Sequence, residues 1–295
     1  MAKLNTIYEE DCLTFMGKLA AQGPTVDVIL TSPPYNINKE YGSYKDNKER
    51  KEYLDWLFDV ADKSLPILKD DGSFFLNIGG RPSDPSIPLS AAEKFIKAGY
   101  KLQNTIHWIK SISFQKEDIG KANGIRDYSI GHFKPIVSDR FLSDFQEYVF
   151  HFTKHGNVKL KKREVGVPYQ DKSNIKRWRQ TEDRRDRGNA WFIPYPTIQE
   201  GRPHPAVFPE KLPRLCISLH GVNKDMLVYD PFIGIGTTAL ACIGLDVNYI
   251  GTEIDPEYIK VARIDIQKRK REATDIGLPE DNNDILIGNK TPKLA

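Results

Sequence analysis

The chain has 295 residues, of which 39% are hydrophobic and 28% charged, and it is long enough for one large domain or two modest ones. It contains neither a run of about 18 apolar residues nor an apolar leader, so we expect a soluble, cytoplasmic protein. The net charge of +3 is too small to indicate a polyanionic partner by itself. The cysteines, Cys12, Cys216 and Cys242, have neither disulfide nor zinc spacing, and we expect buried thiols and no bound metal.

The first half of the chain predicts strands that alternate with helices. Apolar runs indicate the strands, and apolar residues at helical spacing indicate the helices. The expected strands are residues 5–11, 26–30, 73–78, 100–110 and 146–154, and the expected helices are residues 12–20, 48–68 and 85–99. A turn is expected at residues 70–72, a mobile loop at 38–47 and irregular loops at 111–140. This alternation is typical of a layered α/β fold with a mostly parallel sheet.

A proline pair directly follows the strand Val26–Leu30. Residues 31–36 read Thr-Ser-Pro-Pro-Tyr-Asn, and the two prolines remove N–H donors, stiffen the backbone and leave carbonyl oxygens free. Ser32 could accept a hydrogen bond from an amino group while Tyr35 stacks on a planar base. Ligands usually bind at this edge of an open α/β sheet, but an ordinary turn is the alternative that this loop alone leaves open.

The composition changes between residues 159 and 188, where eleven basic residues accompany five acidic ones. Tyr169 and Trp178 lie among the charges, and apolar residues are too sparse for a separate core. Two interpretations stay open. The segment is either a solvated surface excursion or an insert that contacts nucleic acid, with Lys and Arg on the phosphates. Residues 188–195 are apolar again, and a helix is expected to begin near Leu212 and to stop at Gly221.

A second motif follows an apolar strand at residues 226–229. Residues 230–238 read Asp-Pro-Phe-Ile-Gly-Ile-Gly-Thr-Thr and open an alanine-rich helix, so Gly234 and Gly236 allow a ligand to approach the backbone and the helix amino end. No lysine follows Gly236, which argues against a nucleotide triphosphatase loop. Glu253 ends the next strand about 20 residues later, where an acid is placed to bind ribose hydroxyls. Asp255 and Pro256 predict the start of a further helix.

With both motifs in this order, the chain resembles the S-adenosylmethionine-dependent DNA amino-methyltransferases of the β arrangement. The resemblance spans roughly residues 5–265 and implies a circularly permuted, Rossmann-like α/β methyltransferase fold. This fold has a mostly parallel seven-stranded sheet with helices on both faces, plus a small target-recognition insert. The expected division is residues 1–157 for the catalytic part, 158–190 for the basic insert, 191–270 for the cofactor-binding part and 271–295 for a polar tail.

The resemblance also implies roles for individual residues. The residues expected to hold the target base and its amine are Ser32, Pro33, Pro34 and Tyr35. The residues expected to bind S-adenosylmethionine are Asp11, Cys12, Thr31, His204, Pro205, Ala206, Phe208, Asp230, Pro231, Phe232, Gly234, Gly236, Thr237, Thr238, Glu253 and Ile254. Asp11 alone is also well placed to cap the helix that follows it. The residues expected to contact DNA are Lys161, Lys162, Arg163, Lys176, Arg177, Arg179, Arg184 and Arg185.

The expected activity is site-specific methylation of the N4 amine of a flipped cytosine in duplex DNA, by direct transfer without a covalent intermediate. Enzymes of this kind that act on adenine N6 usually carry Asp where this chain has Ser32, and the His-Pro-Ala motif at residues 204–206 also resembles the cytosine N4 group. Cytosine C5 methylation is disfavoured because no cysteine follows a proline. Adenine N6 methylation is the main alternative, ahead of an RNA or protein-glutamine methyltransferase and a non-catalytic DNA-binding protein. A homodimer and a separate cognate restriction endonuclease are expected as further partners.

Overall fold

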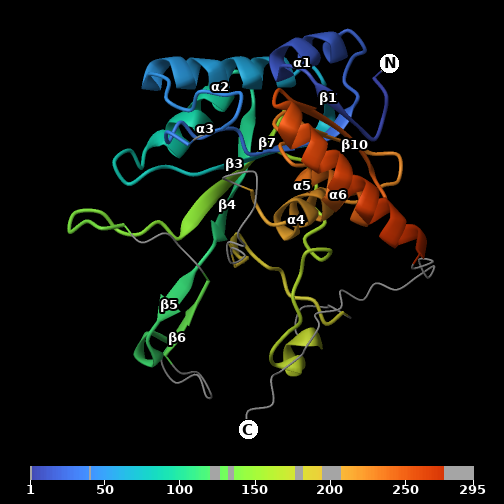
Figure 1. Ribbon diagram of the computed structural model, residues 1–295. Helices are drawn as coiled ribbons and strands as arrows, with labels where there is room; N and C mark the ends of the chain where they lie inside the picture. Colours follow the sequence, from blue (N-terminus) through green and yellow to red (C-terminus); the bar gives the residue numbers. More distant parts are fainter. Residues whose placement is uncertain are drawn as a thin grey trace.

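The computed structural model describes residues 2–39, 41–119, 127–131, 136–176, 182–194 and 207–275. Eight strands in these residues form one sheet, and six α-helices accompany it (Figure 1). The strands of the sheet are β1 (Thr6–Glu9), β2 (Val26–Thr31), β3 (Leu68–Ile78), β4 (Lys101–Ile109), β7 (Gln146–Thr153), β8 (Ala190–Phe192), β9 (Leu227–Asp230) and β10 (Asn248–Glu253). The helices are α1 (Cys12–Ala20), α2 (Arg50–Ser64), α3 (Ile87–Lys97), α4 (Lys211–His220), α5 (Thr237–Gly244) and α6 (Pro256–Asp275).

The strand order is β1-β10-β9-β2-β3-β7-β4-β8. β1, β10, β9, β2 and β3 run parallel as neighbours, and β8 runs parallel to β4. β7 is antiparallel to both β3 and β4, so among the described strands of the sheet it alone opposes the others. The mostly parallel α/β sheet is therefore confirmed, with the three-residue strand β8 as an eighth member. β2 pairs with β9, which brings the two sequence motifs to neighbouring strand ends.

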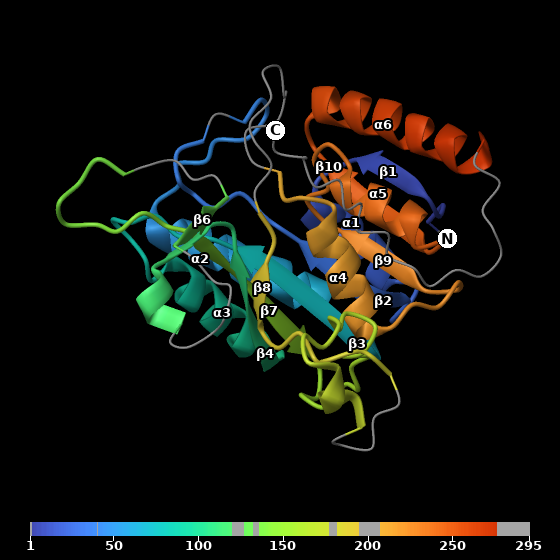
Figure 2. The same cartoon turned by 90° about the horizontal axis from the view of Figure 1, so that it is seen from below.

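Helices cover both faces of the sheet (Figure 2). Val28 and Leu30 of β2 pack in one core with α4, α5 and α6, whereas Ile29 packs in the other core with α1, α2 and α3. This alternation follows from the period of two in a strand. The register against β3 is irregular between Val26 and Val28, and Val26 packs in the α1–α3 core although it lies two residues from Val28. Each such buried side chain contributes about 1.5–3 kcal/mol.

Three local expectations are wrong. α2 ends at Ser64 and not at residue 68, because Pro66 cannot continue a helix and restricts the residue before it. Residues 70–72 form no separate turn but lie within β3, where the register against β2 is irregular. Residues 111–140 contain a hairpin of β5 (Ile112–Phe114) and β6 (Tyr128–Ile130), which projects away from the sheet in Figure 1. Its three-residue strands are too short for a period to be recognised.

Other expectations hold. The strands at 100–110 and 146–154, the helix before Gly221 and the helix that begins at Pro256 are confirmed as β4, β7, α4 and α6. The three cysteines are free and buried. Within the described ranges, no helix combines the length and apolar character that a membrane crossing needs. α6 continues to Asp275, beyond the start of the expected polar tail at residue 271.

Candidate active site

The ends of β2 and β9 are joined by a buried carboxylate. Thr31 Oγ1 donates to Asp230 Oδ1 at 2.7 Å, and Thr238 Oγ1 donates to Asp230 Oδ2 at 2.5 Å. The amide of Phe232 also donates to Oδ1, at 3.0 Å. Burial raises the pKa of Asp230 to about 6, although these hydrogen bonds favour the ionised form. Asp230 thus fixes the Ser-Pro-Pro loop against the glycine turn.

The glycine turn has the backbone geometry that its sequence predicts. Gly234 has φ 52° and Gly236 has φ 88°, a left-handed region that favours glycine. A Cβ atom at Gly236 would also lie 3.0 Å from the Cβ of Ala262 in α6. The turn then opens α5, whose first residue is Thr237. The first N–H groups of a helix have no acceptor within the helix, so this helix end can donate hydrogen bonds to a polar ligand.

Glu253, at the end of β10, closes the turn from the neighbouring strand. Its Oε2 accepts from the amide of Gly234 at 2.9 Å, and its Oε1 accepts from the amides of Ile254 and Asp255 at 2.9 and 3.0 Å. Burial raises the pKa of Glu253, and these amide contacts oppose that shift. The three bonds hold the carboxylate in one orientation, and the oxygens keep further lone pairs for a ligand hydroxyl.

Asp11 and Cys12 lie at the same edge of the sheet, because the amide of Glu10 donates to the carbonyl of Glu253 at 3.0 Å. Asp11 caps α1 by accepting from the amide of Thr14 at 3.0 Å, as its position in the sequence predicts. Cys12 is buried, and this burial raises the pKa of its thiol. The structure therefore brings Asp11 and Cys12 beside Glu253.

Phe232 is the aromatic residue of the glycine turn. Its ring lies 5.3 Å from that of Trp56 in α2. The carbonyl of Pro231, before it, accepts from the hydroxyl of Thr252 at 2.9 Å. Phe208 packs against the core beside α4. The predicted cofactor residues His204, Pro205 and Ala206 lie outside the described residues.

The Ser-Pro-Pro loop is held along its length. The carbonyl of Pro34 accepts from the hydroxyl of Tyr53 at 2.8 Å. Asn36, at φ 59°, exchanges two hydrogen bonds of 2.7 Å with the backbone of Lys48. The carboxylate of Asp46 accepts hydrogen bonds from three backbone amides, those of residues 36, 37 and 39, at 2.7–3.0 Å. Both ends of the segment that the sequence predicts to be a mobile loop are thus anchored.

Sequence reasoning missed three residues beside this loop. Tyr35 donates its hydroxyl proton to Glu147 Oε2 at 2.8 Å, and the hydroxyls of Ser32 and Tyr35 lie 2.8 Å apart. Lys110 Nζ donates to Glu147 Oε1 at 2.8 Å, and Asn77 Nδ2 donates to Oε2 at 2.9 Å. The sequence signals these residues only by their positions near strand ends. Asn77 is the second-last residue of β3 and Lys110 follows β4, whereas Glu147 is the second residue of β7, which runs the opposite way.

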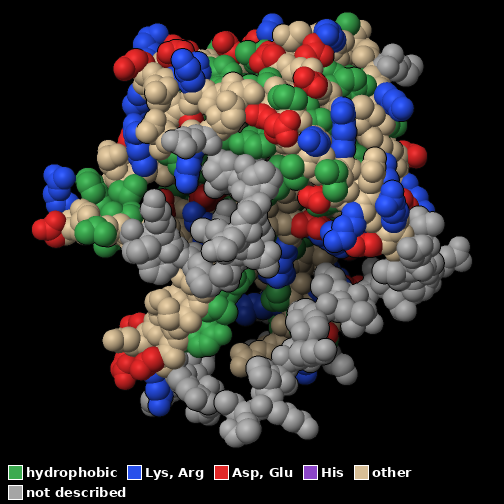
Figure 3. Space-filling model, viewed as in Figure 1, with side chains coloured by type: hydrophobic (Ala, Val, Ile, Leu, Met, Phe, Trp, Pro, Cys, Tyr) green, Lys and Arg blue, Asp and Glu red, His purple; other side chains and the backbone are tan. Residues whose placement is uncertain are grey.

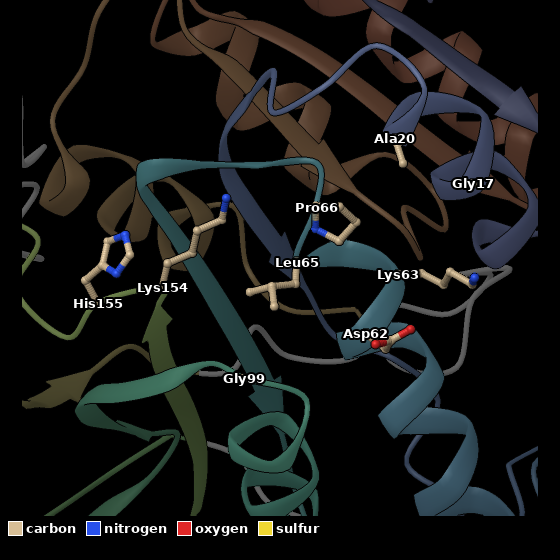
Figure 4. Close-up of a pocket in the computed structure, with 9 residues that line it drawn as sticks. All are labelled: Gly17, Ala20, Asp62, Lys63, Leu65, Pro66, Gly99, Lys154 and His155. Atoms are coloured by element: carbon tan, nitrogen blue, oxygen red, sulfur yellow. The ribbon is translucent and has the colours of Figure 1, made fainter.

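Among the predicted DNA-contacting residues that the structure describes, those at 161–163 follow a segment that is not anchored at this edge. Val158 exchanges hydrogen bonds of 2.7 and 3.0 Å with Gln103 near the start of β4, and the amide of Lys161 donates to Leu219 near the end of α4. Ser32 follows the end of β2, which runs the same way as β4, so residues 158–161 lie at the opposite edge. The pocket shown in Figure 4 lies at this opposite edge, near the end of α2. None of the predicted site residues lines it.

Several of the other basic residues of the insert contact residues of the insert itself. Lys162 lies 3.8 Å from Asp186, and Arg184 donates to the carbonyls of Arg163 and Glu164 at 3.3 Å. The backbone of Arg185 pairs with that of Val167. The side chain of Lys176, and Arg177 and Arg179 altogether, lie outside the described residues. On the face drawn in Figure 3, the described basic and acidic side chains are interspersed.

Asp230 joins the two parts of the candidate site, the Ser-Pro-Pro loop and the glycine turn. Comparison with known proteins shows the family to which the chain belongs. Residues 26–263 match the N6/N4 DNA methylase family. The chain belongs to this family. It is therefore an S-adenosylmethionine-dependent DNA methyltransferase that modifies a base amine, and the resemblance stated from the motifs is confirmed at this level.

The relatives of the DNA methylase include a type II methyltransferase and an enzyme named as an adenine methyltransferase. Type II methyltransferase M.BglII of Bacillus subtilis is 28% identical over 273 residues, which cover 88% of this chain and 68% of the relative. DNA adenine methyltransferase YhdJ of Escherichia coli (strain K12) is 28% identical over 270 residues, which cover 88% of this chain and 83% of the relative. Neither comparison decides between the N4 and N6 amines.

Solved structures share the fold. The cytosine-N4-specific PvuII DNA methyltransferase has a TM-score of 0.62 at 22% identity, over 94% of this chain and 93% of that one. A putative DNA modification methylase from Thermus thermophilus, complexed with S-adenosyl-L-methionine, has a TM-score of 0.55 at 18% identity, over 89% and 95% of the chains. The methyltransferase fold expected from the sequence is thus confirmed.

Proposed function

We propose that this DNA methylase transfers a methyl group to the N4 amine of a specific cytosine in duplex DNA. The observation that carries the proposal is Ser32, whose neutral hydroxyl stands at the amine-accepting position where adenine N6 enzymes of this kind usually have Asp. Adenine N6 is the second candidate, because YhdJ is named an adenine methyltransferase and is as similar in sequence as M.BglII. Membership in the DNA methylase family argues against the RNA, protein-glutamine and non-catalytic alternatives.

The residues around the glycine turn fit the cofactor in their chemistry. Glu253 has a fixed carboxylate with lone pairs to spare for ribose hydroxyls, and Gly234 and Gly236 leave the backbone open to close approach. In this proposal Phe232 and the helix end at Thr237 line the methionine part, while Asp11 and Cys12 lie on the adenine side. The remaining predicted cofactor residues complete the pocket. Bound S-adenosylmethionine supplies the electrophilic methyl group.

The Ser-Pro-Pro loop prepares the amine. The lone pair of an exocyclic amine is delocalised into the base ring, so the nitrogen is a poor nucleophile. Ser32 and the carbonyl of Pro33 accept its two N–H groups, which favours a pyramidal nitrogen, and they hold it in line for transfer. Tyr35 stacks on the base after it leaves the duplex, at a cost of about a few kcal/mol that these contacts offset. No thiolate or covalent intermediate takes part in this step.

The proposal extends to DNA and partners. The basic insert at residues 158–190 contacts the phosphates, between a catalytic part at 1–157 and a cofactor-binding part at 191–270, and the tail at 271–295 is peripheral. A homodimer and a separate cognate restriction endonuclease remain predictions, as does a cytoplasmic location.

The base assignment is tested on the product. Duplex DNA is incubated with the protein and labelled S-adenosylmethionine, digested to nucleosides and examined by mass spectrometry. We expect N4-methylcytosine at one short sequence. N6-methyladenine in its place would reject the cytosine assignment and leave the family assignment intact. Label in RNA or protein, with none in DNA, would reject both.

A further inference from the structure

Ser32 is the end of a chain of polar side chains that converge on one carboxylate. Hydrogen bonds of 2.8 Å connect Ser32 to Tyr35 and Tyr35 to Oε2 of Glu147. Asn77 donates to the same oxygen at 2.9 Å, and Lys110 donates to the other oxygen, Oε1, at 2.8 Å. Glu147 is only 13% exposed and Lys110 only 19%. Ser32 and Tyr35 come from the loop after β2, Asn77 from β3, Lys110 from the residue just after β4, and Glu147 from β7.

The direction of each hydrogen bond in this network follows from the number of donors and acceptors that each group offers. A carboxylate paired with an ammonium group offers only acceptors, and Asn77 must present its amide N–H because Nδ2 also contacts the carbonyl of Tyr148 at 3.2 Å. Burial, and then the charge of Glu147, raise the pKa of Tyr35, so its hydroxyl keeps its proton. That single proton points to Glu147. The oxygen of Tyr35 therefore accepts the proton of Ser32.

We propose that Glu147 is a positioning residue that acts through Tyr35 to keep the Ser32 oxygen free as a pure acceptor for the target amine. This inference rests on the proposed function, since it assumes that Ser32 faces that amine. With its own proton directed to Tyr35, Ser32 turns its lone pairs toward the base. Hydrogen bonds that end on a charge are stronger than neutral ones and polarise their neighbours. The neutral serine thereby gains part of the acceptor strength of a carboxylate.

The same network also fixes the ring that stacks on the base. The Tyr35 hydroxyl is held from two sides, by Ser32 and by Glu147, which restricts the ring to one plane. Space for this arrangement comes from Gly79, just after β3. A Cβ atom there would lie 3.1 Å from Cε2 of Tyr35 and 3.1 Å from Cγ of Glu147. A residue with a side chain at position 79 would therefore crowd both Tyr35 and Glu147.

Glu147→Gln tests the network with almost no change in shape. The side-chain amide of Gln can lie in two orientations. In one its NH2 group faces the donor of Lys110, and in the other it faces the donors of Asn77 and Tyr35, so neither orientation accepts all three hydrogen bonds. We expect the single-turnover rate constant for methyl transfer to fall about 10- to 100-fold, as for loss of a charge-assisted hydrogen bond. The affinities for S-adenosylmethionine and for duplex DNA should stay within about twofold, because Glu147 contacts neither in the proposal.

Tyr35→Phe is the companion variant, because it keeps the stacking ring and removes only the hydroxyl. We expect a similar fall in the rate constant, and little further loss when Glu147→Gln is added, since the path is already broken. Additive losses would indicate a merely structural Glu147 and would overturn the inference. Asp55→Asn is the matched control, because it removes a carboxylate that pairs with Lys51 and Lys94 between α2 and α3. Its rate constant should equal that of the wild type.

The outcomes separate the two proposals. Methyl transfer by the wild type together with an unchanged rate constant in Glu147→Gln or in Tyr35→Phe would overturn the network and leave the function standing. If Glu147→Gln fails to fold, Tyr35→Phe alone decides, with a retained wild-type rate as the contradicting result. Absence of methyl transfer by the wild-type protein to any DNA would reject the proposed function, and the inference with it.

Discussion

Thr31 and Asp230 lie 199 residues apart in the sequence and share a buried hydrogen bond of 2.7 Å. Both side chains are at most 1% exposed. The bond exists because β2 and β9 are neighbours in the sheet, so the residue that ends one strand meets the residue that ends the other. This contact couples the loop proposed to hold the amine to the turn proposed to hold the methyl donor.

Thr31→Val should weaken this coupling with almost no change in volume. The buried carboxylate of Asp230 loses the donor on β2, and leaving a charged group partly unsatisfied costs roughly 1–3 kcal/mol of unfolding free energy. We also expect the pKa of Asp230 to rise above its present value of about 6, because the donor stabilises the ionised form. Urea denaturation at pH 7.5 measures the first effect. A midpoint equal to that of the wild type would show that the contact adds nothing to stability.

Ser32→Ala separates amine binding from cofactor binding. The variant removes the acceptor that the proposal places on the amine, so turnover should fall roughly 100-fold or more, by analogy with loss of a single preorganised hydrogen-bonding group at a reacting centre. Affinity for S-adenosylmethionine should stay nearly unchanged, because Asp230 and Glu253 keep all their contacts. Calorimetric titration with the cofactor and a radiolabel transfer assay measure the two quantities. A large loss of cofactor affinity would contradict the role given to Ser32.

The two motifs could be predicted from sequence because each is a local signal. A proline pair after an apolar strand, and a glycine turn before an alanine-rich helix, are visible within about ten residues of chain. Asn77, Lys110 and Glu147 have no such signature, and their meeting depends on strand order and direction. Glu147 reaches the site only because β7 is antiparallel, which brings the first residues of β7 to the edge where its neighbours end. Long-range pairing of this kind cannot be read from periodicity.

A buried histidine predicts acid sensitivity of the fold. His151 is fully buried between Asn104, at 3.0 Å, and Ser73, also at 3.0 Å, and Ser73 contacts His220 at 2.9 Å. Burial, and then the charge of His220, lower the pKa of His151 from 6.5 to about 3. Between these values the unfolded chain binds a proton that the folded chain does not, so this contribution to stability is complete above pH 6.5 and is lost as pH falls toward 3.

The expected loss from His151 is about 2 kcal/mol between pH 7 and pH 5, at roughly 1.4 kcal/mol per pH unit below 6.5. Urea midpoints at the two pH values measure it. His151→Gln is the control, because a neutral amide cannot titrate, and its pH dependence should be shallower than that of the wild type. Equal slopes in both proteins would show that His151 does not set the acid response.

The position of the basic insert allows its role in DNA binding to be tested separately from catalysis. Lys161, Lys162 and Arg163 follow the segment anchored at the edge opposite Ser32, so a duplex that presents its base to Ser32 must extend around the end of the sheet to reach them. Each phosphate contact adds about 0.9 to the magnitude of the slope of log affinity against log salt. Replacing all three with Gln should weaken DNA binding and flatten that slope by roughly 1–3 units, with methyl transfer at saturating DNA preserved. Fluorescence anisotropy across a salt series measures the slope, and an unchanged value would move the recognition surface to other residues.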